Sequence, residues 1–213
     1  SSALTEQVIV DVLASAFDSA GQRCSALRVL CLQDEIADHT LKMLRGAMAE
    51  CRMGNPGRLT TDIGPVIDSE AKANIERHIQ TMRSKGRPVF QAVRENSEDA
   101  REWQSGTFVA PTLIELDDFA ELQKEVFGPV LHVVRYNRNQ LPELIEQINA
   151  SGYGLTLGVH TRIDETIAQV TGSAHVGNLY VNRNMVGAVV GVQPFGGEGL
   201  SGTGPKAGGP LYL

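Results

Sequence analysis

Helical and strand-like segments alternate along most of this chain, and that order restricts its fold more than any other feature. In the helical segments apolar residues recur three and four positions apart, whereas the strand-like segments are short apolar runs. Strands separated by helices need crossover connections, so the alternation predicts a three-layer α/β fold, a largely parallel sheet covered on both faces. The predicted helices are 4–21, 34–51, 68–86, 141–150 and 164–172; the predicted strands are 28–33, 89–93, 130–136, 155–160 and 179–182, with extended chain over 108–116.

Loops beyond the strand ends carry the binding site in such sheets. The candidate loops are the turn around Cys24, residues 125–129 and residues 183–204. Residues 193–210 hold seven glycines and three prolines, which is too irregular for a helix or a central strand. The charged segment 94–103 predicts a solvated surface loop.

Charge and cysteine usage exclude several classes of protein. The net charge of −6 and the lack of a Lys/Arg stripe argue against a nucleic-acid surface. No apolar run approaches the length of a membrane span, and no signal peptide is expected. Cys24, Cys31 and Cys51 lack paired spacing and the five histidines are scattered, so neither a disulfide framework nor a metal site is predicted. A reducing cytoplasm fits this cysteine usage best.

One cysteine lies between a predicted helix and a predicted strand. Residues 21–25 read Gly-Gln-Arg-Cys-Ser, and the apolar run Val-Leu-Cys-Leu follows at 29–32. A turn with glycine on one side and small residues on the other can present a thiol to a cleft, which suits a nucleophile. A lone cysteine is more often a buried structural residue, so the residues alone leave both interpretations of Cys24 open.

Three motifs, in this order along the chain, resemble the aldehyde dehydrogenase superfamily. They are Gly-Gln-Arg-Cys at 21–24, Glu-Val-Phe-Gly-Pro at 125–129 and Pro-Phe-Gly-Gly at 194–197; Gly-Asn-Pro at 54–56 and Asn-Leu-Tyr-Val-Asn at 178–182 support them. The chain most resembles the L-glutamate γ-semialdehyde (1-pyrroline-5-carboxylate) dehydrogenase branch. Within that branch, residues 23–30 and 204–210 are similar to the dehydrogenase domain of bacterial proline utilisation A proteins.

The resemblance implies that Cys24 is the nucleophile of an NAD-dependent aldehyde oxidation. Its thiolate would add to the carbonyl, the thiohemiacetal would pass hydride to NAD, and water would hydrolyse the remaining thioester. The backbone N–H of Cys24 would supply half of an oxyanion hole. Arg23 could favour the thiolate, although the side chains of adjacent residues often point apart.

The resemblance also assigns Glu125 and Phe127 to cofactor binding. A carboxylate can accept two hydrogen bonds from a diol, and the matching glutamate of the family binds the nicotinamide-ribose hydroxyls. The matching phenylalanine lies against the nicotinamide, and Gly128 and Pro129 would fix the turn that presents both side chains. The residues alone indicate instead a surface glutamate before a turn.

Substrate binding is assigned, again by resemblance, to the end of the chain. Gly187 and Ala188 resemble the loop whose backbone amides hold the α-carboxylate of glutamate semialdehyde, because small residues leave N–H groups open to an anion. Ser25 would add a hydroxyl donor, and Phe195 would pack against the aliphatic part of the substrate. Without the resemblance, the loop would be simply flexible and Phe195 a buried anchor.

The resemblance further predicts how the chain is organised. We expect a catalytic domain over residues 1–185, followed over 186–213 by a glycine-rich, substrate-anchoring loop and a C-terminal coil that stops before the family's oligomerisation strand. The family's cofactor-binding domain, general-base glutamate and oxyanion-hole asparagine would lie upstream. A catalytic-half fragment of this kind should be inactive alone as a dehydrogenase. Its expected partners are a small aldehyde, the cofactor-binding domain of the same polypeptide, and further copies in a homo-oligomer.

Two other classes of function stay open. The first is a cysteine-dependent acyl-transfer enzyme or esterase, which would need a histidine beside Cys24; His160, at a predicted strand end, is the best candidate. A pH–rate profile with a base titrating near neutrality would favour it. The second is a non-catalytic interaction module that binds through its glycine-rich tail, which light scattering on the isolated chain would reveal as association.

Overall fold

The helices form largely where the sequence predicts them. The computed structural model describes residues 2–93, 103 and 105–212. Its helices are α1 (Thr5–Phe17), α2 (Asp34–Glu50), α3 (Ser69–Ser84), α5 (Leu141–Ala150) and α6 (Asp164–Ser173), with 3₁₀ turns η1 (Asp18–Gly21), η2 (Phe119–Glu121) and η3 (Arg138–Gln140). The predictions for α2, α3, α5 and α6 are confirmed to within two residues at each end. Apart from Trp103, the charged segment predicted at 94–103 lies outside the described residues.

The first helix ends earlier than predicted. We expected it to reach Gly21, but α1 stops at Phe17 and the following turn leaves the helical conformation. Ser19, Ala20 and Gly21 have φ angles of 56°, 54° and 65°, all in the left-handed region. A right-handed helix cannot continue through three left-handed residues, so the chain turns toward the first strand instead.

The strands form a mainly parallel sheet, as predicted. Its order is β1 (Val29–Gln33), β4 (Val130–Tyr136), β3 (Thr112–Leu116) and β2 (Val89–Gln91). β4 is parallel to both of its neighbours, with Val29 of β1 opposite His132. β2 is antiparallel to β3, and between these two strands the sequence predicted a charged loop and not a crossover helix. A second parallel pair joins β6 (Thr156–Val159) to β7 (Asn178–Val181), and β5 (Tyr153–Gly154) pairs antiparallel with β8 (Glu198–Gly199).

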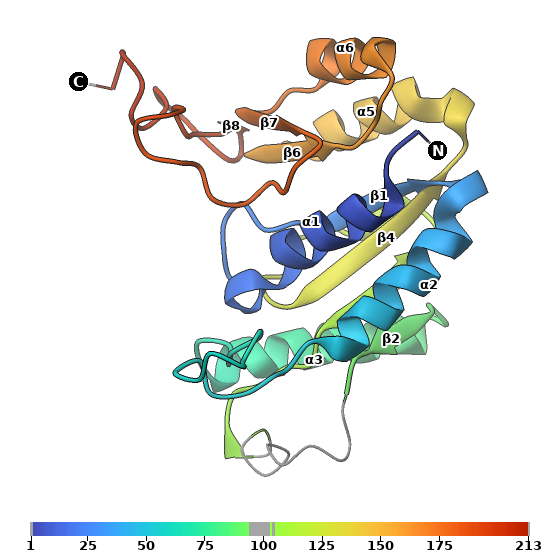
Figure 1. The fold of residues 1–213 in the computed structure, drawn as a ribbon, viewed down its shortest axis with the longest axis vertical. Helices are drawn as coiled ribbons and strands as arrows, with labels where there is room; N and C mark the ends of the chain where they lie inside the picture. The colour runs from blue at the N-terminus through green and yellow to red at the C-terminus, as the bar shows by residue number, and fades with distance from the viewer. Residues whose placement is uncertain (1, 94–102, 104, 213) are drawn as a thin grey trace.

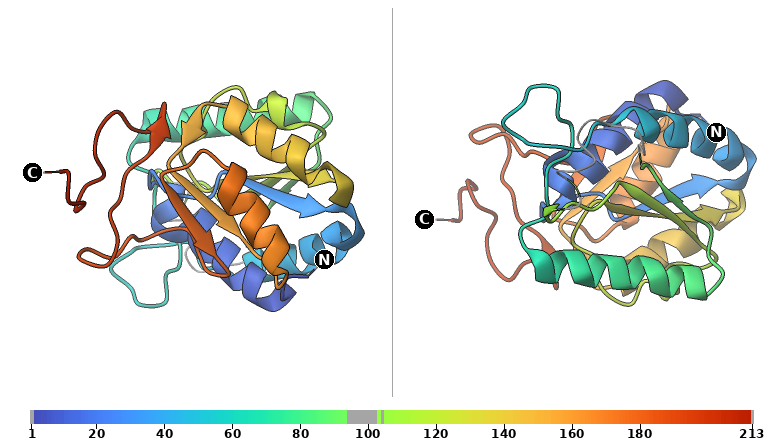
Figure 2. Two further views of the ribbon diagram at one scale, coloured as in Figure 1. Left: turned by 90° about the horizontal axis from the view of Figure 1, so that it is seen from above. Right: turned by 90° about the horizontal axis from the view of Figure 1, so that it is seen from below.

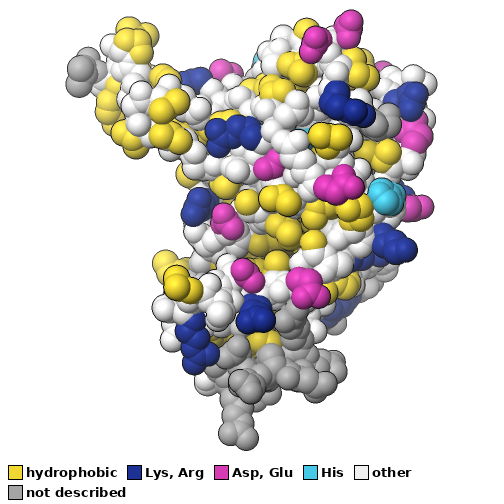
Figure 3. Space-filling view, in the orientation of Figure 1, with side chains coloured by type: hydrophobic (Ala, Val, Ile, Leu, Met, Phe, Trp, Pro, Cys, Tyr) yellow, Lys and Arg dark blue, Asp and Glu magenta, His cyan; other side chains and the backbone are white. Residues whose placement is uncertain are grey.

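Helices cover both faces of the four-stranded sheet, which gives the three layers expected. The view from below in Figure 2 shows the strands between α3 on one side and α1 with α2 on the other. In Figure 1, α5 and α6 lie beside the β6–β7 pair, and the last part of the chain projects away from the body. Apolar side chains gather on this projecting part in Figure 3. Val190 and Leu211, from the last part of the chain, are strongly exposed.

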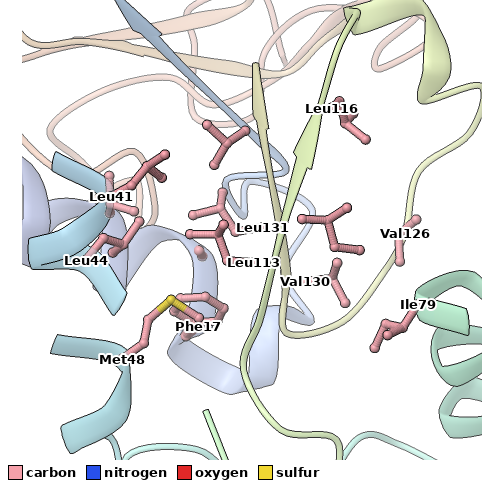
Figure 4. Packing of buried hydrophobic residues seen from close by; sticks show 14 of the residues in the cluster. Phe17, Leu41, Leu44, Met48, Ile79, Leu113, Leu116, Val126, Val130 and Leu131 are labelled. Atoms are coloured by element: carbon pink, nitrogen blue, oxygen red, sulfur yellow. The ribbon is translucent and has the colours of Figure 1, made fainter. Parts of the chain in front are cut away.

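β4 forms the centre of the core. Its burial is continuous from Val130 to Val134, as expected for a central strand of a parallel sheet with helices on both faces. Figure 4 shows the two sides of this core: Phe17 of α1 with Leu41, Leu44 and Met48 of α2 on one face, and Ile79 of α3 with Leu116, Val126 and Val130 on the other.

Among the described residues, a polar pair reaches into the core: the buried His132 of β4 and the half-buried His78 of α3. Their Nε2 atoms lie 2.9 Å apart, and His132 Nδ1 is 3.1 Å from the Arg28 carbonyl oxygen. His132 has no exposed surface. Burial first, and then the charge of His78, lower the pKa of His132 to about 4. His132 is therefore neutral in the folded chain at neutral pH.

This buried histidine predicts a pH-dependent stability. A histidine whose pKa falls from 6.5 to about 4 on folding binds a proton more readily in the unfolded chain. Its contribution is therefore fully present above pH 6.5 and is lost as the pH falls toward 4. Between pH 7 and pH 5 we expect the free energy of unfolding in urea to fall by about 2 kcal/mol. His132→Gln should flatten this dependence; an equal slope in the variant would contradict the assignment to His132.

Candidate active site

Cys24 lies in an exposed turn between α1 and β1. The Ala26 N–H donates to the Arg23 carbonyl oxygen at 3.0 Å and closes the turn around the thiol. Ser19 and Ala20, just before it, hold left-handed conformations that cost non-glycine residues about 1 kcal/mol or more each. Contacts from elsewhere in the fold must therefore hold this turn in place.

Two residues close to Cys24 in the chain, Ser25 and Cys31, are less accessible than Cys24 itself. Ser25 is only 5% exposed, and its carbonyl oxygen accepts a hydrogen bond from Thr156 Oγ1 at 3.3 Å. The backbone of Ser25 thus ties the turn to β6, while its side chain is withdrawn from the surface that carries Cys24. On β1, burial raises the pKa of the Cys31 thiol to about 12, so Cys31 stays protonated at neutral pH.

The second candidate segment presents alternate side chains to solvent. Val126 is buried in the core, whereas the side chain of Glu125 is 39% exposed and Phe127 is 45% exposed. Val126 therefore anchors the segment and leaves a carboxylate and an aromatic ring on the outside. A ribose diol and a planar ring could be bound by these two groups, so the residues present fit the part of NAD that the family resemblance implies for them.

Arg28 joins the two candidate segments. Its Nε donates to Glu125 Oε1 at 3.0 Å, and its Cζ lies 4.6 Å from the centre of the Phe127 ring. Nη1 donates to the Gly21 carbonyl oxygen at 2.6 Å and Nη2 to that of Arg23 at 3.0 Å. Burial lowers the pKa of Arg28, and the negative charges of Glu125 and of the Cys24 thiolate oppose that effect. The guanidinium is thus shared between the Cys24 turn and the Glu125 segment.

The two segments also touch directly through their glycines. A Cβ atom added to Gly21 would lie 2.2 Å from the Gly128 carbonyl oxygen, which is far inside contact distance. On the other side, a Cβ on Gly128 would lie 2.3 Å from Ile75 Cδ1 of α3. Gly21 therefore needs glycine for the two backbones to approach this closely, whereas a Cβ on Gly128 would press on the end of a side chain that can move.

A hollow of about 590 Å³ extends from this junction between β1, β6 and α5. Cys24, Glu125 and Phe127 all lie on its mainly apolar wall, and its size suits a small organic molecule. His160 also lines the hollow, but its Nε2 pairs with Asp11 Oδ2 at 2.9 Å. Among the described residues, no hydrogen bond joins His160 to Cys24.

The predicted substrate residues lie apart from this hollow. Gly187 is exposed with a φ of 75°, and Ala188 and Phe195 are half-buried; none of the three lines the hollow. Phe195 instead exchanges two backbone hydrogen bonds with Ala207, at 3.0 and 2.9 Å. Met185, two residues before Gly187, does line the hollow, and its N–H donates to Ser15 Oγ at 3.1 Å. The glycine-rich segment therefore begins at the hollow, leaves it over Gly187 to Phe195, and meets it again at Leu200 and Ser201.

Sequence reasoning considered Arg23 and overlooked Arg28. The side chain of Arg23 turns back toward Ser19, because its Nε donates to Ser19 Oγ at 3.0 Å. The available signal for Arg28 was a basic residue directly before an otherwise apolar strand, where a surface role is the usual interpretation. Within the described part of the chain, no group of three or more His, Cys, Asp or Glu residues could hold a metal ion. No helix of that part is long and apolar enough to cross a membrane.

Comparison with known proteins gives a single family. The model of the aldehyde dehydrogenase family matches residues 1–213. The bifunctional protein PutA of Salmonella typhimurium is 94% identical over 213 residues, which are all of this chain and 16% of that protein. The 1-pyrroline-5-carboxylate dehydrogenase 1 of Halalkalibacterium halodurans is 38% identical over 204 residues, or 95% of this chain and 38% of that protein.

Solved structures agree with the sequence comparison. A crystal structure of bifunctional proline utilization A has a TM-score of 0.91 and 51% identity, and the match covers 99% of this chain and 21% of that one. A 1-pyrroline-5-carboxylate dehydrogenase structure has a TM-score of 0.84 and 34% identity, covering 98% of this chain and 39% of that one. The chain thus spans about one sixth of the PutA protein that it matches.

Proposed function

This chain belongs to the aldehyde dehydrogenase family, and we propose that it carries the nucleophile of an enzyme that oxidises L-glutamate γ-semialdehyde to glutamate with NAD. One observation carries this proposal: the exposed Cys24 turn packs against the segment that presents Glu125 and Phe127, with Arg28 between them. The substrate class is taken from relatives named PutA and 1-pyrroline-5-carboxylate dehydrogenase.

In the proposed reaction, Cys24 Sγ adds as a thiolate to the aldehyde carbonyl carbon and forms a thiohemiacetal. NAD, when bound, accepts the hydrogen and electron pair lost as this adduct becomes a thioester. Water then hydrolyses the thioester, which releases the carboxylic acid and restores the thiol. The Cys24 N–H would donate to the carbonyl oxygen as negative charge develops on it.

The cofactor would lie against the Glu125 segment. The exposed Glu125 carboxylate would accept hydrogen bonds from the two hydroxyls of the nicotinamide ribose, and the exposed Phe127 ring would support the nicotinamide. Gly187, Ala188, Ser25 and Phe195 remain proposed substrate contacts. Binding through Ser25 would require its buried side chain to become accessible. Binding through Gly187, Ala188 or Phe195 would require these residues to approach the hollow, which none of them lines.

A chimera tests the proposal with the chain in a full-length context. This 213-residue chain replaces the matching segment of the Salmonella typhimurium relative, to which it is 94% identical. We expect the chimera to form NADH from NAD and glutamate semialdehyde, and the isolated chain to form none. If the relative is active and a folded chimera is not, the proposed function is wrong. NADH formation by the isolated chain would overturn only the expectation that it is inactive alone.

The acyl-transfer alternative makes a different prediction for the isolated chain. It needs His160 as a base for Cys24, whereas His160 is hydrogen-bonded to Asp11. Ester hydrolysis that disappears in both Cys24→Ser and His160→Gln would favour this alternative. Hydrolysis that depends on Cys24 alone fits an aldehyde dehydrogenase cysteine acting without its cofactor.

A further inference from the structure

Arg28 occupies a position that the proposed chemistry does not yet use. It directly precedes β1, and its side chain is only 13% exposed. Its guanidinium donates to two carbonyl oxygens of the Cys24 turn, those of Gly21 and Arg23. It also donates to Glu125 Oε1 and, at 3.4 Å, to the Gly128 carbonyl oxygen. One side chain therefore contacts both halves of the proposed site, and its partner Glu125 is 97 residues away in the sequence.

The chemistry of arginine suits this position. A guanidinium holds five N–H donors in a rigid plane, whereas a lysine ammonium is a compact charge with three rotatable donors. Here the N–H groups around the edge of the plane meet four acceptors while the group itself lies over the Phe127 ring. A lysine would keep the positive charge, but its three N–H groups could not reach all four acceptors at once.

Other contacts anchor each segment in the fold without Arg28. The Leu27 N–H donates to the Ser15 carbonyl oxygen at 2.8 Å, which holds the Cys24 turn on α1. Val126 is buried in the core, and the Thr112 N–H donates to the Pro129 carbonyl oxygen at 2.9 Å. Loss of the Arg28 contacts should therefore leave the fold intact and change mainly the spacing between the two segments.

We propose that Arg28 is a positioning residue that fixes Cys24 and Glu125 at one spacing, so that the cofactor ribose held by Glu125 is in register with the Cys24 nucleophile. The inference rests on the proposed function for its catalytic consequence. That Arg28 couples the two segments structurally rests on its contacts alone. This coupling can be tested separately.

Arg28→Lys in the chimera tests the catalytic consequence. Loss of hydrogen bonds to a charged group should raise KM for NAD by about tenfold or more. KM for the aldehyde should stay within about twofold, because the hydrogen bonds of Arg28 reach none of the proposed substrate contacts. Calorimetric titration with NAD and no aldehyde should show the same weakening of cofactor binding. Equal changes in both KM values, or an unchanged KM for NAD, would overturn the proposal.

Arg87→Lys is a matched control. Arg87 is another shielded arginine, paired with the carboxylates of Asp117 and Glu121. It lies just before the edge strand β2, which β3 separates from β4. It should reproduce any general cost of replacing a paired guanidinium, visible as a shift in melting temperature. If Arg87→Lys raises KM for NAD as much as Arg28→Lys does, Arg28 has no special positioning role.

Amide hydrogen exchange on the chain itself tests the coupling without any enzyme activity. Arg28→Lys should speed exchange in residues 19–28 and in residues 122–129 together, while the β4 amides stay protected. Faster exchange in only one of the two segments would contradict the coupling. An inactive wild-type chimera would reject the proposed function and leave this exchange test still able to decide the role of Arg28.

Discussion

Cys24→Ser in the chimera is expected to lower kcat for aldehyde oxidation by about a thousandfold or more, because a serine hydroxyl is a much weaker nucleophile than a thiolate. The turn should keep its conformation, since serine has nearly the same shape as cysteine and Cys24 is exposed. Single-turnover kinetics with excess enzyme would show whether the acyl-forming step itself is lost. Residual turnover within about tenfold of wild type would exclude Cys24 as the nucleophile.

Cys31→Ser is the matched control, because Cys31 lies only seven residues away on β1. Burial raises the pKa of Cys31 to about 12, so its thiol is protonated at pH 8. Cys31→Ser should therefore leave iodoacetamide labelling and turnover nearly unchanged, whereas Cys24→Ser should remove the labelling. Equal labelling of the two single variants would count against a reactive Cys24.

The second large effect is expected from Gly21→Ala. The added Cβ would meet the Gly128 carbonyl oxygen at 2.2 Å and the Ala16 carbonyl oxygen at 2.8 Å, and both are backbone atoms. Alanine would also be strained at the φ of 65°. We expect the free energy of unfolding to fall by about 3 kcal/mol or more, because neither backbone can move without disturbing the core. The variant should also lose aldehyde oxidation in the chimera, since the Cys24 turn must separate from the Glu125 segment.

Two other glycines distinguish the cost of backbone strain from the cost of a steric clash. Gly86 has a φ of 76° but open space around its Cβ position, so Gly86→Ala should cost only the strain, about 1–2 kcal/mol. Gly46 lies within α2 with nothing near its Cβ position, so Gly46→Ala should be neutral or stabilising by about 0.5–1 kcal/mol. Urea unfolding of the three variants would test this order. If Gly21→Ala costs no more than Gly86→Ala, the close approach of Gly21 and Gly128 is not as described.

Local features of the fold could be predicted where one physical rule governed the segment. The continuous apolar run at 130–136 became β4, with the same bounds, because a strand between two helical layers has no polar face. The helix at 141–150 was also predicted with its observed bounds, and Pro142 in its first turn is a strong start signal. The prediction was wrong at 18–21, because left-handed conformations at Ser19 and Ala20 depend on contacts that helical periodicity does not report.

The candidate site, like the fold, contains residues that the sequence predicted and a residue that it did not. Cys24, Glu125 and Phe127 were predicted from motifs and lie on one hollow, whereas Gly187, Ala188 and Phe195 do not line it. Arg28 was missed because its role depends on partners 97 and 100 residues away. A basic residue beside an apolar strand looks the same in sequence whether it faces solvent or carries four hydrogen bonds.

The sequence by itself determined the alternation of helices and strands, the buried character of β4 and the order of the motifs, because each depends on residues close together in the chain. Only the tertiary structure decided that β4 pairs with β1, with Val29 opposite His132. That pairing brings the turn before β1 to the segment before β4, so that Arg28 can bind Glu125 and Gly21 can touch Gly128. Periodicity is satisfied by many strand orders, and packing selects one by matching the shapes of distant surfaces.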